Sequence, residues 1–329
     1  MASADKNIRA WTFTHEGYPK ALHRSTLPSP PRPAATELHV RVKAAALNPV
    51  NIQLMNLPVW RYLPAFFVGP DKGVCEDFSG VVEAAGKDSG FDVGDEMSGT
   101  LQDVIAIDTK SSVVVRRPRD MNWEQAAALP LVWLTARTTT ANVESHIQKS
   151  GRLAVLGGSS AVGMYVLQLA NQRGWKVLTT CSSRNTEFVR SMGATSVVDY
   201  NTSDVAQAIR EYGPAAIIDC VGGTSCIDLA KRYVTIVGDK TGRDSMGGAA
   251  VYLWNPQMVI RTLLGRMGLG KSYDCVNLEF RKEWLEETES LDRSKIVLDS
   301  TWEFDQAGEA FAKLNTGRAR GKVVVKVCV

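Results

Sequence analysis

A glycine-rich turn in the middle of the chain has the composition of a phosphate-binding loop. The apolar segment 153–156 leads into GGSSAVG at 157–163, and the residues that follow have the spacing of an amphipathic helix. At a helix N-terminus, unpaired backbone N–H groups and the positive end of the helix dipole attract anions. We therefore expect a pyrophosphate to bind here, and the candidate contact residues are Gly157, Gly158, Ser159, Ser160, Ala161, Val162 and Gly163.

The surroundings of the turn strengthen this interpretation. The dinucleotide fingerprint is GxGxxG, and here Ser160 takes the place of the middle glycine between Gly158 and Gly163. The bare pattern is weak, but a second strand-like segment at 176–181 follows the helix and completes a βαβ unit. The pattern therefore favours dinucleotide binding, and a turn with a purely structural role is the alternative.

The end of that second segment indicates which dinucleotide binds. An NAD site usually has Asp or Glu there to bind the ribose 2′-hydroxyl, whereas this chain reads TTCSSR at 179–184. No carboxylate would repel a 2′-phosphate, the hydroxyls of Ser182 and Ser183 can donate hydrogen bonds, and Arg184 can form an ion pair. We therefore predict NADPH as the cofactor; an Arg184 that is merely solvated is the alternative.

The composition is that of an ordinary globular protein. The 329 residues are 44% hydrophobic and 22% charged, and the formal net charge of +3 is too small to indicate a nucleic-acid surface. No apolar run has the about 18 residues needed to cross a bilayer, and no targeting pattern is evident, so we expect a cytoplasmic protein. Six cysteines and four histidines lack the spacing of a disulfide framework or a metal site, and we expect neither.

Two patterns of secondary structure divide the chain. Short alternating apolar segments predict a β-rich domain over residues 1–121. Asn122 is an expected helix N-cap, and Pro130 interrupts the helical spacing that follows it. Strands and helices then alternate within residues 122–269, which predicts an α/β fold with a doubly wound parallel sheet. β-rich segments return within residues 270–329, which are therefore expected to complete the first domain.

Four blocks along the chain read LNPVN (47–51), GVCEDFSGVVEAAG (73–86) with GFDVGDEM (90–97), AAALPLVWLTA (126–136) with the glycine turn, and GRARGKVVVKV (317–327). With these blocks the chain resembles the medium-chain dehydrogenase/reductase superfamily, specifically its zinc-free quinone oxidoreductase and enoyl reductase (zeta-crystallin-like) branch. The sequence as a whole is most similar to those of fungal members, which often act in secondary metabolism. This resemblance implies a GroES-like β domain made from both chain ends and an inserted Rossmann domain that binds NADPH.

The resemblance also implies roles for individual residues. It places Asn48 and Thr135 beside the nicotinamide as catalytic candidates. Tyr200 would join the 2′-phosphate site, and the end of a strand is its alternative place. The remaining candidates are Val221 and Gly222, facing the ribose and nicotinamide, and Arg320 and Lys322, either closing over the cofactor or lying on the surface as charges that flank Gly321.

Zinc-dependent relatives and typical family members differ from this chain at specific places. Zinc-dependent members have a His-Glu pair in the block that reads Cys75-Glu76-Asp77 here, together with a four-cysteine lobe that this chain lacks. The family commonly has aspartate at the position of Asn51 and a longer stretch around 99–104. These two departures put the usual substrates of the family in doubt.

The chemistry implied by the resemblance is hydride delivery from NADPH to a quinone or to an activated C=C bond. Some enoyl reductases of the superfamily use a tyrosine after the Asn-Pro block as the acid. Tyr62 is the nearest tyrosine but lies beyond the expected place, so a packing role for Tyr62, with water as the proton donor, is the alternative. Large apolar side chains suggest a hydrophobic substrate; the candidates are Met55, Trp60, Phe66, Trp133, Trp254 and Met258.

Three functions are open at this point. The first is an NADPH-dependent reductase of quinones or α,β-unsaturated carbonyl compounds. The second is a dedicated pathway enzyme, such as a trans-acting enoyl reductase that works with a polyketide synthase. The third is a non-catalytic NADPH-binding protein. The segment VYLW (251–254) is either an edge strand that pairs across a homodimer, as in relatives, or an ordinary last strand of the sheet.

Overall fold

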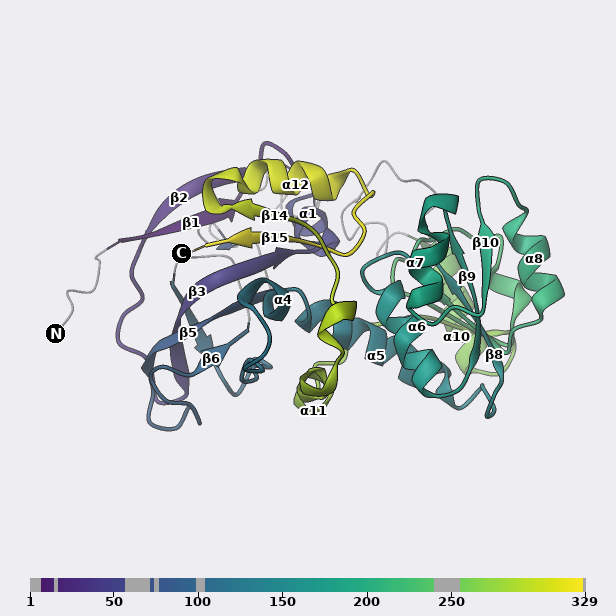
Figure 1. Ribbon diagram of the computed structural model, residues 1–329, viewed down its shortest axis with the longest axis horizontal. Coiled ribbons are helices and arrows are strands. Elements are labelled where there is room, and N and C mark those ends of the chain that lie inside the picture. Colours follow the sequence, from purple (N-terminus) through teal and green to yellow (C-terminus); the bar gives the residue numbers. More distant parts are fainter. Residues whose placement is uncertain are drawn as a thin grey trace. The chain divides into compact units, whose positions relative to one another are not determined.

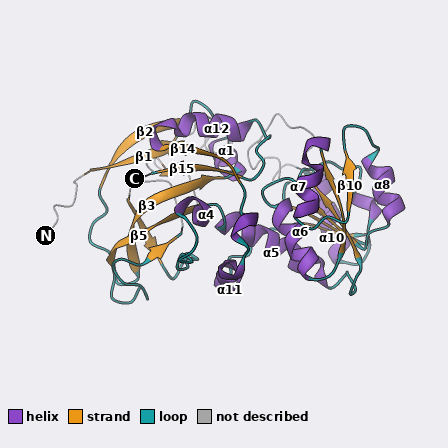
Figure 2. Ribbon diagram, in the orientation of Figure 1, coloured by secondary structure: helices purple, strands orange, loops and turns teal. Residues whose placement is uncertain are grey.

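The computed structural model describes residues 7–14, 17–56, 72–73, 77–98, 104–239 and 255–327. The chain forms two compact units, one of residues 1–131, 245–250 and 280–329 and the other of residues 132–244 and 251–279. The units divide at 131/132 and 279/280, about ten residues after the sequence-predicted boundaries. Strands lie in both units, and helices flank the strands of each (Figure 2).

The first unit is built on two sheets. A three-stranded sheet has the order β2-β1-β4, with β1 (Asn7–Phe13), β2 (Leu22–Pro28) and β4 (Lys72–Gly73). The second sheet joins the two ends of the chain, because C-terminal strand β15 pairs with β3 in the order β14-β15-β3-β5-β6, with β7 also on β3 (Figure 1). Its strands are β3 (Glu37–Leu47), β5 (Asp77–Ala85), β6 (Glu96–Met97), β7 (Val104–Asp108), β14 (Leu298–Glu303) and β15 (Lys322–Lys326).

Short helices cover this unit. Helix α12 packs against β14 and β15, and Phe311 contributes to a core that also contains Leu38, Phe78 and Val323. Asn122 caps α4 as expected, because its Oδ1 accepts the Gln125 N–H at 2.8 Å. The helices are α1 (Pro49–Met55), α4 (Trp123–Ala127), α11 (Lys282–Glu286) and α12 (Ala307–Asn315), with 3₁₀ turns η3 (Glu287–Ser290), η4 (Arg293–Lys295) and η5 (Phe304–Gln306).

The second unit contains one parallel sheet of six strands in the order β10-β9-β8-β11-β12-β13. The order reverses between β8 and β11, which is the doubly wound arrangement expected from the sequence. The strands of this sheet contain buried apolar residues such as Val155 and Ile217, as is typical of a sheet covered on both faces. The strands are β8 (Arg152–Leu156), β9 (Lys176–Cys181), β10 (Ser196–Asp199), β11 (Ala216–Asp219), β12 (Arg232–Thr235) and β13 (Ser272–Cys275).

The helices between these strands complete the predicted alternation. Helix α5 begins at Pro130, where the sequence predicts a break, and runs from the first unit into the second. None of the helices in the described ranges is both long and apolar enough to cross a membrane. The helices are α5 (Pro130–Glu144), α6 (Gly163–Gln172), α7 (Thr186–Ser191), α8 (Val205–Tyr212) and α10 (Pro256–Arg266), with η1 (Ser183–Asn185) and η2 (Ile227–Leu229).

Candidate functional site

The predicted cofactor-binding residues of the second unit gather at one edge of its sheet. The glycine turn follows β8, Ser182 to Arg184 follow β9, Tyr200 follows β10, and Val221 with Gly222 lies just beyond β11. These four strands are parallel neighbours, so their carboxyl ends share an edge. In open α/β sheets this edge, at the point where the strand order reverses, is where ligands bind.

Hydrogen bonds from strand β9 hold the glycine turn. Thr180 Oγ1 accepts the N–H of Gly157 at 2.9 Å, and the carbonyl of Thr180 accepts the N–H of Gly158 at 3.1 Å. Within the turn, Ser160 Oγ accepts the Gly163 N–H at 3.0 Å. The hydroxyl that replaces the middle glycine of the fingerprint therefore satisfies one of the orphan donors at the start of α6.

Three other N–H groups of the turn are left for a ligand. The backbone N–H groups of Ser159, Ala161 and Val162 donate to no other residue in the described part of the chain. All three precede the first turn of α6, where the helix dipole presents its positive end. This arrangement fits a pyrophosphate.

The two glycines at the start of the turn are required by packing inside the unit. A Cβ on Gly158 would lie 2.2 Å from Thr179 Oγ1, and a Cβ on Gly157 would lie 2.4 Å from a methyl of Val221. Gly157 also has φ +82°, in the left-handed region. Side chains are therefore excluded at Gly157 and Gly158 because the turn packs closely against Val221 and Thr179 of the same unit.

The predicted 2′-phosphate site contains an acidic residue that the sequence analysis missed. Arg184 is exposed and forms no ion pair or hydrogen bond within the described ranges, and Tyr200 is 40% exposed. Asp199 Oδ2 accepts the Ser183 N–H at 3.0 Å. The backbone N–H of Asn201, also bonded to this carboxylate, is the main reason that the pKa of Asp199 lies below its ordinary value. Strand pairing brings Asp199 beside Cys181, a placement that no local pattern indicates.

A second missed carboxylate shapes the loop after β11. Asp219 is fully buried, and its Oδ1 accepts the N–H groups of Val221 and Gly222, each at 2.9 Å. Its Oδ2 accepts the hydroxyl of Thr235 at 2.9 Å. Burial raises the pKa of this carboxyl group. An aspartate inside the apolar strand segment AAIIDC is the signal that could have identified it.

In the first unit, three predicted or neighbouring residues form a buried polar network. Lys322 Nζ donates to Asn48 Oδ1 at 2.5 Å and to Asp77 Oδ2 at 2.8 Å, and Asn48 Nδ2 donates to the same carboxylate oxygen at 2.8 Å. Asn48, Asp77 and Lys322 have exposed fractions of 1%, 1% and 2%. Lys322 is therefore an interior residue and does not lie on the surface beside Gly321.

The sheet topology explains why these three residues meet. Strand β3 is antiparallel to both β15 and β5, its neighbours on either side. Asn48 follows the last residue of β3, whereas Asp77 and Lys322 are the first residues of β5 and β15. The end of the middle strand thus coincides with the starts of the two outer strands. Asn51 supports the arrangement because its Oδ1 accepts the Asn48 N–H at 2.7 Å.

The same carboxylate also holds the start of helix α5. Asp77 Oδ1 accepts the N–H of Leu131 at 2.9 Å. Thr135 lies one turn further along this helix and is half-buried, and its carbonyl accepts the Thr139 hydroxyl at 3.0 Å. Asp77 is therefore bonded to one catalytic candidate and to the helix that carries the other.

The remaining predicted site residues have other places. Met55, Trp133 and Met258 are buried at 1%, 3% and 7% exposure; Met55 and Met258 belong to the cores of their units, and the Trp133 ring packs edge-on against Tyr165. Arg320 is exposed, and its backbone N–H donates to Asp299 Oδ1 at 2.7 Å. Outside the described residues lie Trp60, Tyr62, Phe66, Cys75, Glu76, residues 99–103 and Trp254 with its segment.

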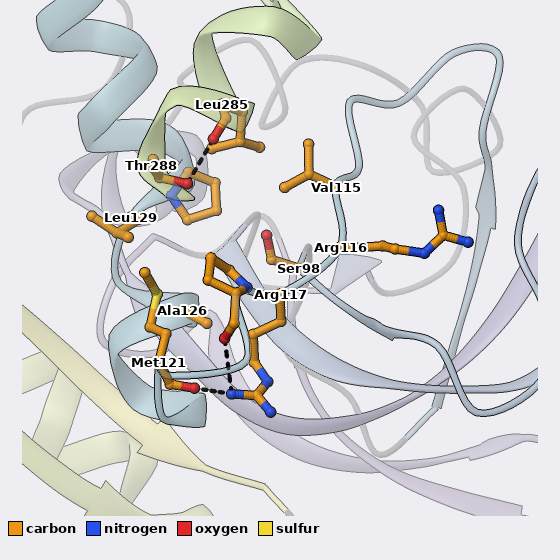
Figure 3. A pocket seen from close by; sticks show the side chains of 11 residues that line it. Ser98, Val115, Arg116, Arg117, Met121, Ala126, Leu129, Leu285 and Thr288 are labelled. Atoms are coloured by element: carbon orange, nitrogen blue, oxygen red, sulfur yellow. Dashed lines mark hydrogen bonds between the residues drawn. The ribbon is translucent and has the colours of Figure 1, made fainter. Parts of the chain in front are cut away.

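A small pocket in the first unit contains none of these candidates. Its volume is about 10 Å³, near the space of one water molecule. Figure 3 shows the guanidinium of Arg117 turned to the carbonyls of Pro118 and Met121, while the side chain of Arg116 points away. The walls are mainly apolar, with Thr288 bonded to the Leu285 carbonyl, so we assign the pocket to packing.

Comparison with known proteins adds a family, two relatives and a fold. The family described as zinc-binding dehydrogenase matches residues 192–325. A probable zinc-binding oxidoreductase, mitochondrial, of Arthroderma benhamiae is 32% identical over 280 residues, covering 76% of this chain and 78% of that protein. A trans-enoyl reductase of Aspergillus terreus is 27% identical, covering 99% and 98%.

A solved structure shares the architecture. The quinone oxidoreductase of Escherichia coli, in complex with NADPH, superimposes with a TM-score of 0.74 at 19% identity, covering 97% of this chain and all of that one. At this identity the likeness shows the fold, including the GroES-like and Rossmann domains that the sequence predicts.

Proposed function

The chain belongs to the medium-chain dehydrogenase/reductase superfamily and is an oxidoreductase of that type, and from this premise we propose that it is a zinc-independent, NADPH-dependent reductase. Its substrate would be a quinone or the activated C=C bond of a hydrophobic α,β-unsaturated carbonyl compound. The observation that carries the proposal is the set of unpaired N–H groups of Ser159, Ala161 and Val162 at the start of α6.

NADPH is preferred to NADH because of the residues after β9. Arg184 offers an exposed guanidinium without a partner in the described structure, and the hydroxyls of Ser182 and Ser183 lie beside it in the chain. Asp199, whose carboxylate accepts the Ser183 N–H, adds a negative charge beside this site, so the positive charge that recognises the 2′-phosphate has to come from Arg184. The complex of the Escherichia coli quinone oxidoreductase with NADPH supports this choice.

When bound, the cofactor supplies a hydride. The chain has to bind and orient the cofactor and the substrate, and it has to exclude water. Asp219 holds the loop of Val221 and Gly222, which we assign to the ribose and nicotinamide side. We assign Asn48 and Thr135 to the nicotinamide end of the cofactor, where the hydride is transferred. We expect Tyr62 or water to protonate the reduced substrate.

Zinc does not fit the described donors, although the family is described as zinc-binding. In the Asn48 network, Asn48 Oδ1 and Asp77 Oδ2 both face the ammonium of Lys322, and Asp77 Oδ1 accepts the Leu131 N–H. The described ranges contain no group of three or more His, Cys, Asp or Glu side chains that could hold an ion. A second cation beside Lys322 would be repelled at short range, so we derive no step through a metal.

Titration of the purified protein with NADPH and NADH, followed by nicotinamide fluorescence, tests the proposal. We expect tight NADPH binding, weaker NADH binding, and oxidation of bound NADPH by 1,4-benzoquinone or 2-cyclohexen-1-one. Binding of neither nucleotide would contradict the assignment of the glycine turn. Binding without oxidation across a broad panel of electrophiles would instead indicate a non-catalytic NADPH-binding protein.

A dedicated trans-acting enoyl reductase is the second candidate. Its support is the trans-enoyl reductase of Aspergillus terreus, which this chain matches over almost its whole length. In that case the substrate would be a polyketide chain held by a synthase. Reduction of a free enoyl-thioester mimic by the isolated protein would favour the first candidate, and reduction that needs the synthase would favour the second.

The proposal also includes a cytoplasmic location and a homodimer. Cell fractionation tests the location, which matters because the Arthroderma benhamiae relative is named mitochondrial. Light scattering of the full chain tests the oligomeric state.

A further inference from the structure

The orientation of the Asn48 side-chain amide is fixed by its two partners. The ammonium of Lys322 can only donate hydrogen bonds, so the atom facing it at 2.5 Å must be the amide oxygen. The Asp77 carboxylate, 2.8 Å from Lys322 Nζ, accepts from the amide nitrogen on the other side. If the oxygen and nitrogen of Asn48 were exchanged, its NH₂ group would face the Lys322 ammonium, which is also a donor, and its oxygen would face the Asp77 carboxylate, which is also an acceptor.

This orientation leaves Asn48 with one polar hydrogen to offer. Its Nδ2 carries two N–H groups; Asp77 accepts one, and no other described residue accepts the second. Asn48 is 1% exposed, so water does not readily satisfy that hydrogen. A buried donor without a partner is costly and therefore requires an explanation.

We propose that Lys322 and Asp77 are positioning residues for Asn48. Lys322 binds the Asn48 amide oxygen and Asp77 binds one of its N–H groups, so that the other N–H serves the reaction as a hydrogen-bond donor to the carbonyl oxygen of the bound electrophile. This role rests on the proposed function, because hydride delivery to an enone or quinone places negative charge on that oxygen. A fixed N–H donor in a site without water stabilises such charge strongly. Asp77 would keep the donor in register with α5 through the Leu131 N–H.

The test compares three variants in the full-length protein. Lys322→Met removes the ammonium that holds the amide oxygen, and Asn48→Asp removes the donor while leaving Lys322 paired. Lys326→Met is the matched control, because Lys326 ends the same strand with a side chain that is 43% exposed. Far-UV circular dichroism and thermal unfolding establish which variants are folded; Asn48→Asp preserves the test if Lys322→Met does not fold.

The first measurement is single-turnover hydride transfer from NADPH to 2-cyclohexen-1-one or 1,4-benzoquinone. We expect the rate to fall about 100-fold in Asn48→Asp and about tenfold or more in Lys322→Met. The dissociation constant of NADPH should change little in either, and Lys326→Met should behave as the wild type. Wild-type rates in the folded Asn48→Asp or Lys322→Met protein would overturn the inference and leave the proposed function standing.

The second measurement needs no ligand. With selective ¹⁵N-asparagine labelling, the Asn48 side-chain signal is the one lost in Asn48→Asp. We expect two well-separated, slowly exchanging Nδ2 protons in the wild type and in Lys326→Met, and rapid exchange in Lys322→Met. If the wild type binds no NADPH, the proposed function fails, and this signal still decides whether Lys322 holds the amide: an unchanged signal in Lys322→Met would overturn that arrangement.

Discussion

Gly158 lies so close to Thr179 on the neighbouring strand that a Cβ added to it would come within 2.2 Å of the threonine hydroxyl. That hydroxyl is itself committed, because Thr179 Oγ1 donates to the Val155 carbonyl at 2.7 Å. Thr179 is fully buried, so it has no free space to move into. The sequence pattern places Gly158 in a pyrophosphate-binding turn, whereas the structure shows that a contact with the neighbouring strand already excludes a side chain at Gly158.

Gly158→Ala should therefore destabilise the protein itself. Overpacking of a buried site typically costs about 1–3 kcal/mol, and the turn that would bind NADPH should be displaced as well. In Gly158→Ala/Thr179→Ala the obstructing atoms are gone, so the double variant should be less destabilised than the sum of the two single changes. Urea unfolding of the four proteins measures this coupling. Strict additivity would show that the two residues do not compete for space.

Arg184→Ala should reduce NADPH affinity while leaving NADH affinity nearly unchanged. A charge-assisted hydrogen bond contributes about 1.5–3 kcal/mol, and exposure to solvent reduces this, so a loss of about tenfold is expected for NADPH alone. Arg190→Ala is the control, because Arg190 is an exposed arginine in the last turn of α7, the helix that follows Arg184 in the chain. Fluorescence titrations at two salt concentrations check this. Equal losses for both nucleotides would remove Arg184 from the 2′-phosphate site.

Ser160→Gly should separate the structural role of the serine from cofactor binding. Its hydroxyl accepts the Gly163 N–H, and replacing a capping serine by glycine typically costs only about a few tenths of a kcal/mol, so a small loss of stability is expected. The freed N–H joins those of Ser159, Ala161 and Val162, and NADPH affinity should be kept or increased. Thermal unfolding and NADPH titration are the measurements. Wild-type stability with abolished NADPH binding would mean that the hydroxyl itself contacts the ligand.

Local sequence patterns were sufficient for the second unit because its construction is local. Apolar strands, amphipathic helices and glycine turns follow one another in the chain order, and a parallel sheet with short crossovers then places the strand ends together. The sequence therefore predicted the glycine turn, and the same kind of local signal predicted the N-cap Asn122 and the break at Pro130 at the end of the first unit's N-terminal segment. Asp199 was missed because its contact with Ser183 depends on which strand lies beside β9.

The Asn48 network could not be predicted in the same way. Its contacts join residues 245 and 274 positions apart, through a sheet in which the last strand of the chain pairs with the third. A lysine beside a glycine near the C-terminus has the pattern of a surface residue or of a cofactor contact, the two possibilities that the sequence left open for Lys322. Only the register of β15 on β3 shows that its ammonium lies beside Asp77.

Asp219→Asn should change how stability depends on pH. Burial raises the pKa of Asp219 above the unfolded value of about 3.9, so the native state holds a proton that the unfolded chain releases. Stability from this group is complete below the unfolded pKa and is lost as pH rises through the folded pKa. Asparagine keeps the network without a charge, because its oxygen can accept from Val221 and Gly222 and its amide can donate to Thr235.

The unfolding free energy of Asp219→Asn relative to the wild type should therefore increase between pH 4 and pH 8, by about 1.4 kcal/mol for each unit by which the pKa is raised. Urea unfolding at several pH values measures this difference. Asp228→Asn, at an exposed position of the same unit, should follow the wild-type pH dependence. A difference for Asp219→Asn that decreases with rising pH would show that the folded state prefers the ionised carboxylate, held by its three donors against the cost of burial.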